Sequence, residues 1–284
     1  MNNLGYTKKL FILPFDHRGS LVKSVFGEVG ELTSFEKQEI ILQKNIIYEA
    51  FKKAMDEGLP PRENAAVLVD EEYGKDILED AKRQGFKIVL TTEESGIKEF
   101  IFEYGEDFKT HIEHYNPLFV KALFYYKDEL KPSEKENLKT LSDYCHDNGH
   151  KLLLEVVTGD LDSQTRSAKL LKTILDFQTE NIEPDIWKIE GMDKREHYEN
   201  VLGEMKKNDR KNVSAIILGR GEDKHKVEEW ILQGKNVDGI IGFAIGRTVF
   251  SEPLLELRDG KISREQTVGK IAKNYQYFYN LFNS

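Results

Sequence analysis

Eight short apolar runs, each followed by a longer charged segment, constrain the fold of this chain more than any other feature of its sequence. Each run has the length of a β-strand, is rich in β-branched or aromatic residues, and is bounded by Gly, Asp or Pro. Near-continuous apolar runs are typical of strands buried on both faces, as in parallel sheets. The runs are residues 10–15, 65–70, 86–91, 119–126, 151–157, 185–190, 214–219 and 239–244.

The segments between the runs have the apolar spacing of helices, with Ser34 and Ser133 as predicted N-caps. Strands that alternate with helices pair in parallel, and eight such units close most naturally into a (β/α)8 barrel. A doubly wound open sheet is the alternative, but no G-x-G-x-x-G motif follows the first run. We therefore predict that residues 1–284 form a single α/β domain, a TIM barrel. The glycine-rich stretch from Gly19 to Gly30 predicts a mobile loop over the barrel mouth.

The charge and cysteine content exclude several classes of function. With 41 basic and 50 acidic residues the formal charge is −9, which argues against binding of nucleic acid or an anionic membrane. Cys145 is the only cysteine, so no intrachain disulfide can form, and no stretch approaches the ~20 apolar residues of a membrane span. We expect a cytoplasmic protein whose partner is a small molecule. The sequence does not fix the oligomeric state, and a homo-oligomer is compatible with it.

One lysine stands where a strand of a parallel barrel should be apolar. Lys188 lies within the run 185–190, near the strand end where such barrels carry their chemistry. Desolvation and a second ammonium lower the pKa of a lysine, and its neutral amine can then form a Schiff base with a carbonyl. Lys121 would supply the second charge, and Glu155, on the strand between them, would move protons. The alternative is a Lys–Glu pair that fills a barrel layer, or side chains that point outwards, because strand parity cannot be read from the sequence.

The last two strands each end in a glycine–arginine pair. Gly219, Arg220 and Gly221 end the seventh run, and Gly246 and Arg247 follow the eighth. Loops after strands seven and eight are the usual phosphate position in these barrels. Glycines let backbone N–H groups approach the phosphate, and an arginine adds a bidentate clamp. The two pairs together predict a site for a phosphorylated substrate.

Polar residues at other strand ends complete the candidate site. Asp16 and Arg18 follow the first run and Glu190 ends the sixth; we expect Asp16 to act in catalysis and the other two in substrate binding. His17 is the one histidine of seven at such a strand end. A zinc site needs about three converging ligands, which the sequence does not assemble. We therefore predict no metal and no cofactor.

These motifs together resemble a known family. The segments LVDEEYG, VKALFYY, LE, WKIE and GRT resemble, in this order, the class I tagatose-bisphosphate aldolases; they lie at 68–74, 120–126, 154–155, 187–190 and 246–248. A closer resemblance is to the aldolase-like domain of bacterial inositol catabolism, which is often fused behind a deoxyketogluconate kinase. The motifs that carry it are PFDHR, LGR and GFAIGRT, at 14–18, 218–220 and 242–248.

The resemblance implies a class I aldolase that cleaves 2-deoxy-5-keto-gluconate 6-phosphate into dihydroxyacetone phosphate and malonate semialdehyde. The roles that it implies are Schiff-base formation by Lys188, acid–base catalysis by Glu155 beside Lys121, a first-strand acid at Asp16, and phosphate binding by Arg247 and the loop 219–221.

Three alternatives stay open at the level of the sequence. The residues after Glu190, Gly-Met-Asp at 191–193, depart from the tagatose enzymes, and a tagatose- or fructose-bisphosphate-type aldolase is the first alternative. The second is metal-assisted cleavage or decarboxylation, with Asp16, Asp70 and Glu155 as oxygen ligands. The third is a regulator that binds a sugar phosphate in the same barrel without turnover.

Overall fold

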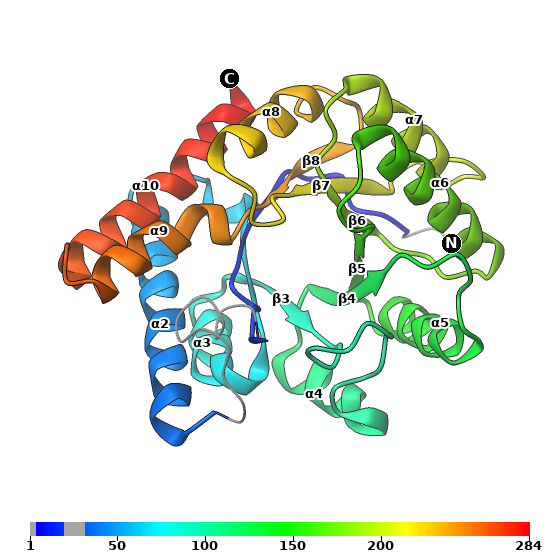
Figure 1. Cartoon of the computed structure of the whole chain (residues 1–284). Coiled ribbons are helices and arrows are strands. Elements are labelled where there is room, and N and C mark those ends of the chain that lie inside the picture. Colours follow the sequence, from blue (N-terminus) through cyan, green and yellow to red (C-terminus); the bar gives the residue numbers. More distant parts are fainter. Residues whose placement is uncertain (1–3, 20–31) are drawn as a thin grey trace.

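The computed structural model describes residues 4–19 and 32–284, and their strands close into a parallel barrel (Figure 1). Each strand pairs in parallel with the next one along the chain, and the last strand pairs with the first. The (β/α)8 barrel predicted from the sequence is thereby confirmed. The strands are β1 (Leu10–Pro14), β2 (Ala65–Val69), β3 (Lys87–Thr91), β4 (Phe119–Tyr125), β5 (Lys151–Val157), β6 (Ile186–Glu190), β7 (Ser214–Leu218) and β8 (Ile240–Ala244).

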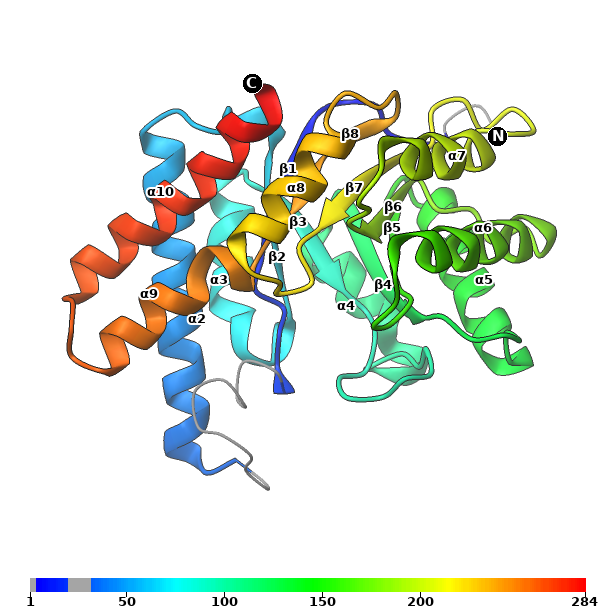
Figure 2. The same ribbon diagram turned by 45° about the horizontal axis from the view of Figure 1, so that its top comes forward.

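Helices surround the barrel (Figures 1 and 2). No helix in the described parts of the chain has the length and hydropathy needed to cross a membrane. Apart from Gly19, the predicted glycine-rich loop lies outside the described residues. The helices are α2 (Ser34–Asp56), α3 (Glu71–Gln84), α4 (Phe108–Tyr115), α5 (Pro132–Asp147), α6 (Ser163–Thr179), α7 (Arg195–Met205), α8 (Lys224–Gly234), α9 (Arg247–Arg258) and α10 (Arg264–Asn283), with single 3-10 turns at η1 (Arg62–Asn64) and η2 (Gly105–Asp107).

The two N-caps predicted from the sequence are wrong. Thr33, not Ser34, caps α2: its hydroxyl accepts a hydrogen bond from the Glu36 N–H, and the Glu36 carboxylate accepts one from the Thr33 N–H. This reciprocal pair is a capping box, which satisfies two backbone donors at once. Ser133 lies inside α5, and the N-cap residue of that helix, Lys131, makes no side-chain bond to it.

Alternate residues of each strand face different cores. On β6, Trp187 and Ile189 point outward and pack with the helices, whereas Ile186 belongs to a cluster that fills the barrel interior. That inner cluster contains mainly residues from the amino-terminal parts of the strands: Leu10, Ile12, Ala66, Leu68, Val89, Phe119, Leu153, Ile186, Ile216, Ile241 and Ala244. The inward-pointing residues that follow them, toward the carboxyl ends of the strands, therefore lie on top of a packed apolar layer.

The ends of the chain close the ring. Helix α10 packs against α2 (Figure 1), and the Tyr275 hydroxyl donates a hydrogen bond of 2.7 Å to the carbonyl of Phe11 in β1. In β8, a Cβ atom on Gly242 would lie 1.8 Å from the carbonyl oxygen of Leu10. Only glycine permits this approach of the last strand to the first.

Candidate active site

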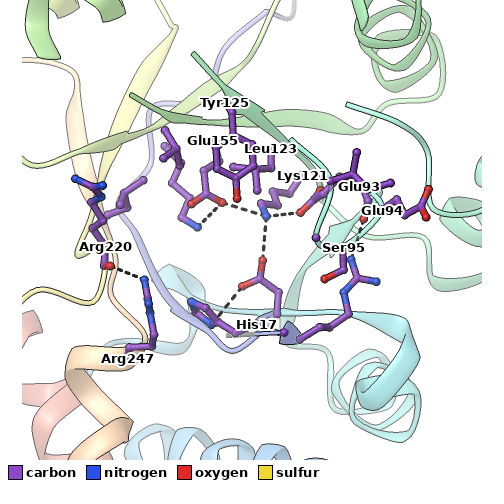
Figure 3. A pocket seen from close by; sticks show the side chains of 18 residues that line it. His17, Glu93, Glu94, Ser95, Lys121, Leu123, Tyr125, Glu155, Arg220 and Arg247 are labelled. Atoms are coloured by element: carbon purple, nitrogen blue, oxygen red, sulfur yellow. Dashed lines mark hydrogen bonds and ion pairs between the residues drawn. The ribbon is translucent and has the colours of Figure 1, made fainter. Parts of the chain in front are cut away.

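A charged pocket of about 510 Å³ opens at the carboxyl ends of the strands, where chemistry is expected in this fold. Figure 3 shows its side chains converging from opposite walls of the barrel. Of the residues predicted from the sequence, Asp16, Arg18, Lys121, Glu155, Lys188, Arg220 and Arg247 line it, together with His17, Glu93, Glu94, Leu123, Tyr125, Val157 and Leu218. Glu190 and the glycines 219, 221 and 246 are not among the lining residues.

Lys188 and Glu155 form the central pair of the pocket. They are direct register partners on β6 and β5, and Lys188 Nζ lies 2.8 Å from Glu155 Oε2. Each stands two residues beyond an inner-cluster residue, Ile186 on β6 and Leu153 on β5, so both side chains point inward. Lys188 is only 4% exposed. The structure thus brings the predicted nucleophile and the predicted acid–base group into contact inside the barrel.

Lys121 reaches the same carboxylate from β4. Its Nζ lies 3.0 Å from Glu155 Oε2 and 2.9 Å from Asp16 Oδ2, and it also donates to Glu93 Oε1. Burial by itself would lower the pKa of Lys121, but the negative charges of these three carboxylates outweigh it and raise that pKa well above its usual range. Lys121 is therefore a permanent ammonium, and it joins the carboxylates of three different strand ends.

The two lysines in turn keep Glu155 and Asp16 ionised. Burial opposes ionisation of both carboxyls, yet the positive charges of Lys121 and Lys188 lower the pKa of each below its usual range. Ionised carboxylates beside a buried amine are proton acceptors in position.

His17 stands next to this cluster as a neutral imidazole. Its Nδ1 lies 3.9 Å from Asp16 Oδ1 and has no hydrogen-bond partner among the described residues. Burial lowers the pKa of His17 to about 4, and the charges of Arg247 and Lys188 act in the same direction against that of Asp16. At neutral pH the ring therefore adds no charge to the pocket.

Two arginines form the opposite side of the pocket, at the ends of β7 and β8. The Arg247 guanidinium donates to the backbone carbonyl of Arg220, and its Nε is buried without a partner among residues 4–19 and 32–284. Gly221 has φ +82°, and a Cβ there would lie 2.6 Å from the Arg247 guanidinium carbon. The glycine thus gives the arginine room, and this cation, which lines the pocket, keeps one buried donor unused.

Glu190 acts behind this wall. Its carboxylate lies 3.0 Å from Arg220 Nε and 3.7 Å from Arg166 Nε, and it accepts a 2.8 Å bond from the Thr158 N–H. The residue is 2% exposed. Because Arg220 in turn holds Arg247 through its backbone carbonyl, Glu190 supports the arginines from below rather than facing a ligand.

Two further buried groups were given no role from the sequence, although Glu93 stands among the polar residues at the strand ends. Lys44, on α2, is fully buried and donates to Asp70 and to the carbonyls of Phe15 (2.5 Å) and His17 (3.1 Å). It thereby ties down the turn that carries Asp16. A lysine among the apolar positions of the predicted helix 35–55 was the available signal for it.

Glu93 is the second group, and Arg18 holds it in place. Arg18 donates a 2.8 Å bond to the Glu93 carbonyl and a further bond to the Glu103 carboxylate, so it spans the hairpin between β3 and α4. Burial raises the pKa of Glu103 to about 7 despite the charge of Arg18.

The acidic residues are not arranged as a metal site. Among the described residues, no group of three or more His, Cys, Asp or Glu side chains could hold a metal ion. Asp70, one of three oxygen ligands in the metal-assisted alternative, instead pairs with Lys44 and caps α3 through the Tyr73 N–H.

Comparison with known protein families decides the family of the chain. A family profile described as "Uncharacterized protein conserved in bacteria (DUF2090)" matches residues 3–284. The chain belongs to this family. No curated protein matches this DUF2090 chain.

Solved structures share the fold of this DUF2090 chain at low sequence identity. Fructose-bisphosphate aldolase from Plasmodium falciparum, solved with TRAP and an inhibitor, is 8% identical with a TM-score of 0.72, and the match covers 97% of this chain and 91% of the aldolase. A Schiff-base-forming fructose-1,6-bisphosphate aldolase is 14% identical with a TM-score of 0.61, covering 96% and 94%. An archaeal fructose-1,6-bisphosphate aldolase, with its catalytic lysine bound to a carbinolamine intermediate, is 15% identical with a TM-score of 0.60, covering 97% and 94%.

Proposed function

We propose that this chain is a class I aldolase that cleaves a phosphorylated keto-sugar acid through a Schiff base on Lys188. The proposed substrate is 2-deoxy-5-keto-gluconate 6-phosphate, and the products are dihydroxyacetone phosphate and malonate semialdehyde. The observation that carries the proposal is the 2.8 Å contact between Lys188 Nζ and Glu155 Oε2 inside the pocket. A buried amine next to an ionised carboxylate is the pair that carbonyl addition and dehydration require. The likeness to Schiff-base-forming aldolases in fold supports the same chemistry.

The first half of the proposed reaction joins substrate and enzyme. The neutral amine of Lys188 adds to the C5 ketone and gives a carbinolamine, and loss of water gives an iminium ion. Glu155 accepts the proton that the nitrogen loses and passes it to the new oxygen of the carbinolamine. A second proton, taken up from water through the same carboxyl, lets the hydroxyl leave as water. Lys121 stays charged throughout, because three carboxylates surround it.

The second half breaks the carbon chain. The C3 hydroxyl loses its proton to Asp16, the C3–C4 bond breaks, and its electron pair moves to the iminium as an enamine. C3 leaves as the aldehyde carbon of malonate semialdehyde. Protonation of the enamine at C4 and addition of water then release dihydroxyacetone phosphate and free Lys188.

The arginines at β7 and β8 are proposed to hold the phosphate. Arg247 has a buried donor without a partner within the described chain. It follows β8 and donates a hydrogen bond to the carbonyl of Arg220, which follows β7. A phosphate bound here would lie beside Lys188, because β6 is the neighbour of β7. This order matches a substrate whose ketone is one carbon from its phosphate.

The proposal is tested by product release. The protein is incubated with 2-deoxy-5-keto-gluconate 6-phosphate, fructose 1,6-bisphosphate or tagatose 1,6-bisphosphate, and dihydroxyacetone phosphate is measured enzymatically, with and without a chelator. We expect release from the keto-sugar acid that the chelator does not change. Release only from a bisphosphate would show that the substrate is a bisphosphate and not the keto-sugar acid. Release that the chelator abolishes would show metal-assisted cleavage in place of a Schiff base. Binding of the sugar phosphate without release would identify a regulator.

A further inference from the structure

Glu93 is a buried carboxyl in the pocket that the reaction described above does not use. It follows β3 and is 7% exposed, and one of its oxygens, Oε1, accepts a hydrogen bond from Lys121. The other oxygen, Oε2, is buried and has no partner within the described chain. A buried polar atom without a partner destabilises the folded state. Because Glu93 lines the pocket, a ligand there can supply the missing partner (Figure 3).

The backbone holds this carboxyl firmly in position. Glu93 forms an antiparallel bridge with Phe102, and the neighbouring Glu94 N–H donates to the Ile101 carbonyl at 2.9 Å. Arg18 grips the Glu93 carbonyl at 2.8 Å. The Oε2 atom is therefore presented by a braced hairpin, as a ligand-binding group should be.

The position of Glu93 in the barrel indicates which part of a substrate it would meet. Arg220 follows β7 and Glu93 follows β3, four strands away in a closed ring of eight, so they stand on opposite walls. Lys188, on β6, stands next to the arginine side, and Lys121, on β4, stands next to Glu93. A substrate anchored by its phosphate at the arginines and bonded to Lys188 would extend its remaining carbons toward Glu93.

We propose that Glu93 is a substrate-contacting residue, whose Oε2 forms a hydrogen bond with an oxygen of the aldehyde fragment that leaves on bond cleavage. This inference rests on the proposed aldolase function and adds the site for the second product. Since Lys121 already occupies Oε1, Oε2 is the oxygen that carries the proton when Glu93 is neutral. A protonated carboxyl donates to an aldehyde, hydroxyl or carboxylate oxygen alike.

Burial makes this neutral form of Glu93 easier to reach than it is in water. Burial raises its pKa, and the negative charge of Asp16 adds to the effect, while the ammonium of Lys121 opposes it. Arg18 and Glu103 face the same hairpin, and they pair with each other. Cleavage should therefore slow as the pH rises through the pKa of Glu93, because its ionised form can no longer donate.

The test separates the two halves of the reaction. Dihydroxyacetone phosphate lacks the aldehyde fragment, so its borohydride-trapped adduct with the enzyme should form equally in wild type and in Glu93→Ala. Cleavage of the full substrate should fall in Glu93→Ala by about ten- to a hundred-fold in kcat/KM, the worth of one hydrogen bond to a charged or strongly polar group. Glu93→Gln keeps an acceptor for Lys121 and a donor at the second position. It should recover much of the rate and lose the alkaline fall of the wild-type pH profile.

A matched control is Glu106→Gln, the same charge change on an exposed residue that does not line the pocket, which should leave both measurements unchanged. Adduct formation that falls in Glu93→Ala as much as cleavage does would show that Glu93 only supports Lys121, and this would overturn the inference. So would full cleavage activity in Glu93→Ala, or a pH profile of Glu93→Gln that matches the wild type. Absence of any adduct in the wild type would instead remove the proposed function itself.

Discussion

The two sides of the pocket hold their charges in opposite ways. On the β4–β6 side, Lys121 and Lys188 share the carboxylate of Glu155, at 3.0 and 2.8 Å. On the β7–β8 side, Arg220 pairs with Glu190, but Arg247 has only a backbone carbonyl as partner and makes no ion pair within the described chain. A buried charge that lacks a counterion is costly, so it is kept where a ligand supplies one. The paired side is therefore suited to proton transfer within the protein, and the unpaired side to binding an anion.

The largest effect is expected at the paired side. Lys188→Ala removes the proposed nucleophile, and turnover should fall by at least about 1,000-fold, as it does when a covalent catalyst loses its attacking group. Glu155 keeps Lys121 as its partner at 3.0 Å, so no carboxylate is orphaned and the fold should survive. Steady-state kinetics measure the loss, and thermal unfolding followed by circular dichroism checks the fold. A variant that retains most of the wild-type turnover would exclude Lys188 as the nucleophile.

The second prediction concerns stability, and it compares a substitution of Lys121 with one of Lys188. Lys121→Met leaves Asp16, Glu93 and Glu155 without their shared ammonium, and only Glu155 keeps a lysine partner. Breaking a buried ion pair from one side costs about 3–5 kcal/mol, so urea unfolding should show a loss of that size. Lys188→Ala, measured alongside, should lose much less stability. Equal losses of unfolding free energy in the two variants would contradict the view that Lys121 is the cation that stabilises these carboxylates.

The unpaired side should give a smaller and selective effect. Arg247→Ala removes a charge-assisted contact worth about 1.5–3 kcal/mol, which weakens the affinity for phosphorylated substrate by roughly ten- to a hundred-fold. The affinity for the unphosphorylated sugar should stay close to that of the wild type. Arg220→Ala is the comparison variant, because Arg220 already pairs with Glu190. If Arg247→Ala lowers the affinity for both sugars equally, the arginine supports the fold and does not bind the phosphate.

The sequence analysis predicted the barrel and the paired side for the same physical reason. A parallel barrel requires apolar strands, so a charge within one of them, such as Lys188 or Lys121, is conspicuous without a structure. It did not predict which oxygen pairs with which nitrogen, because strand parity and side-chain reach follow from the closed ring.

The roles of two buried residues could not be predicted, because their partners come from elements far away in the sequence. Lys44 lies on a helix whose other face is charged, and Glu93 lies in a hairpin that Arg18 closes from another strand end. Neither pattern is local in sequence. Glu190 was predicted to bind substrate, but it pairs with Arg220 and does not line the pocket, and its strand position alone could not show this.

The central claim, a Schiff base on Lys188, is tested most directly by trapping it. The full-length protein is incubated with dihydroxyacetone phosphate, reduced with borohydride, digested, and mapped by mass spectrometry, with Lys188→Ala as the control. We predict one added three-carbon phosphate unit on the peptide that contains Lys188, and none in the control. An adduct confined to another lysine, or no adduct at any pH at which the protein stays folded, would contradict this account.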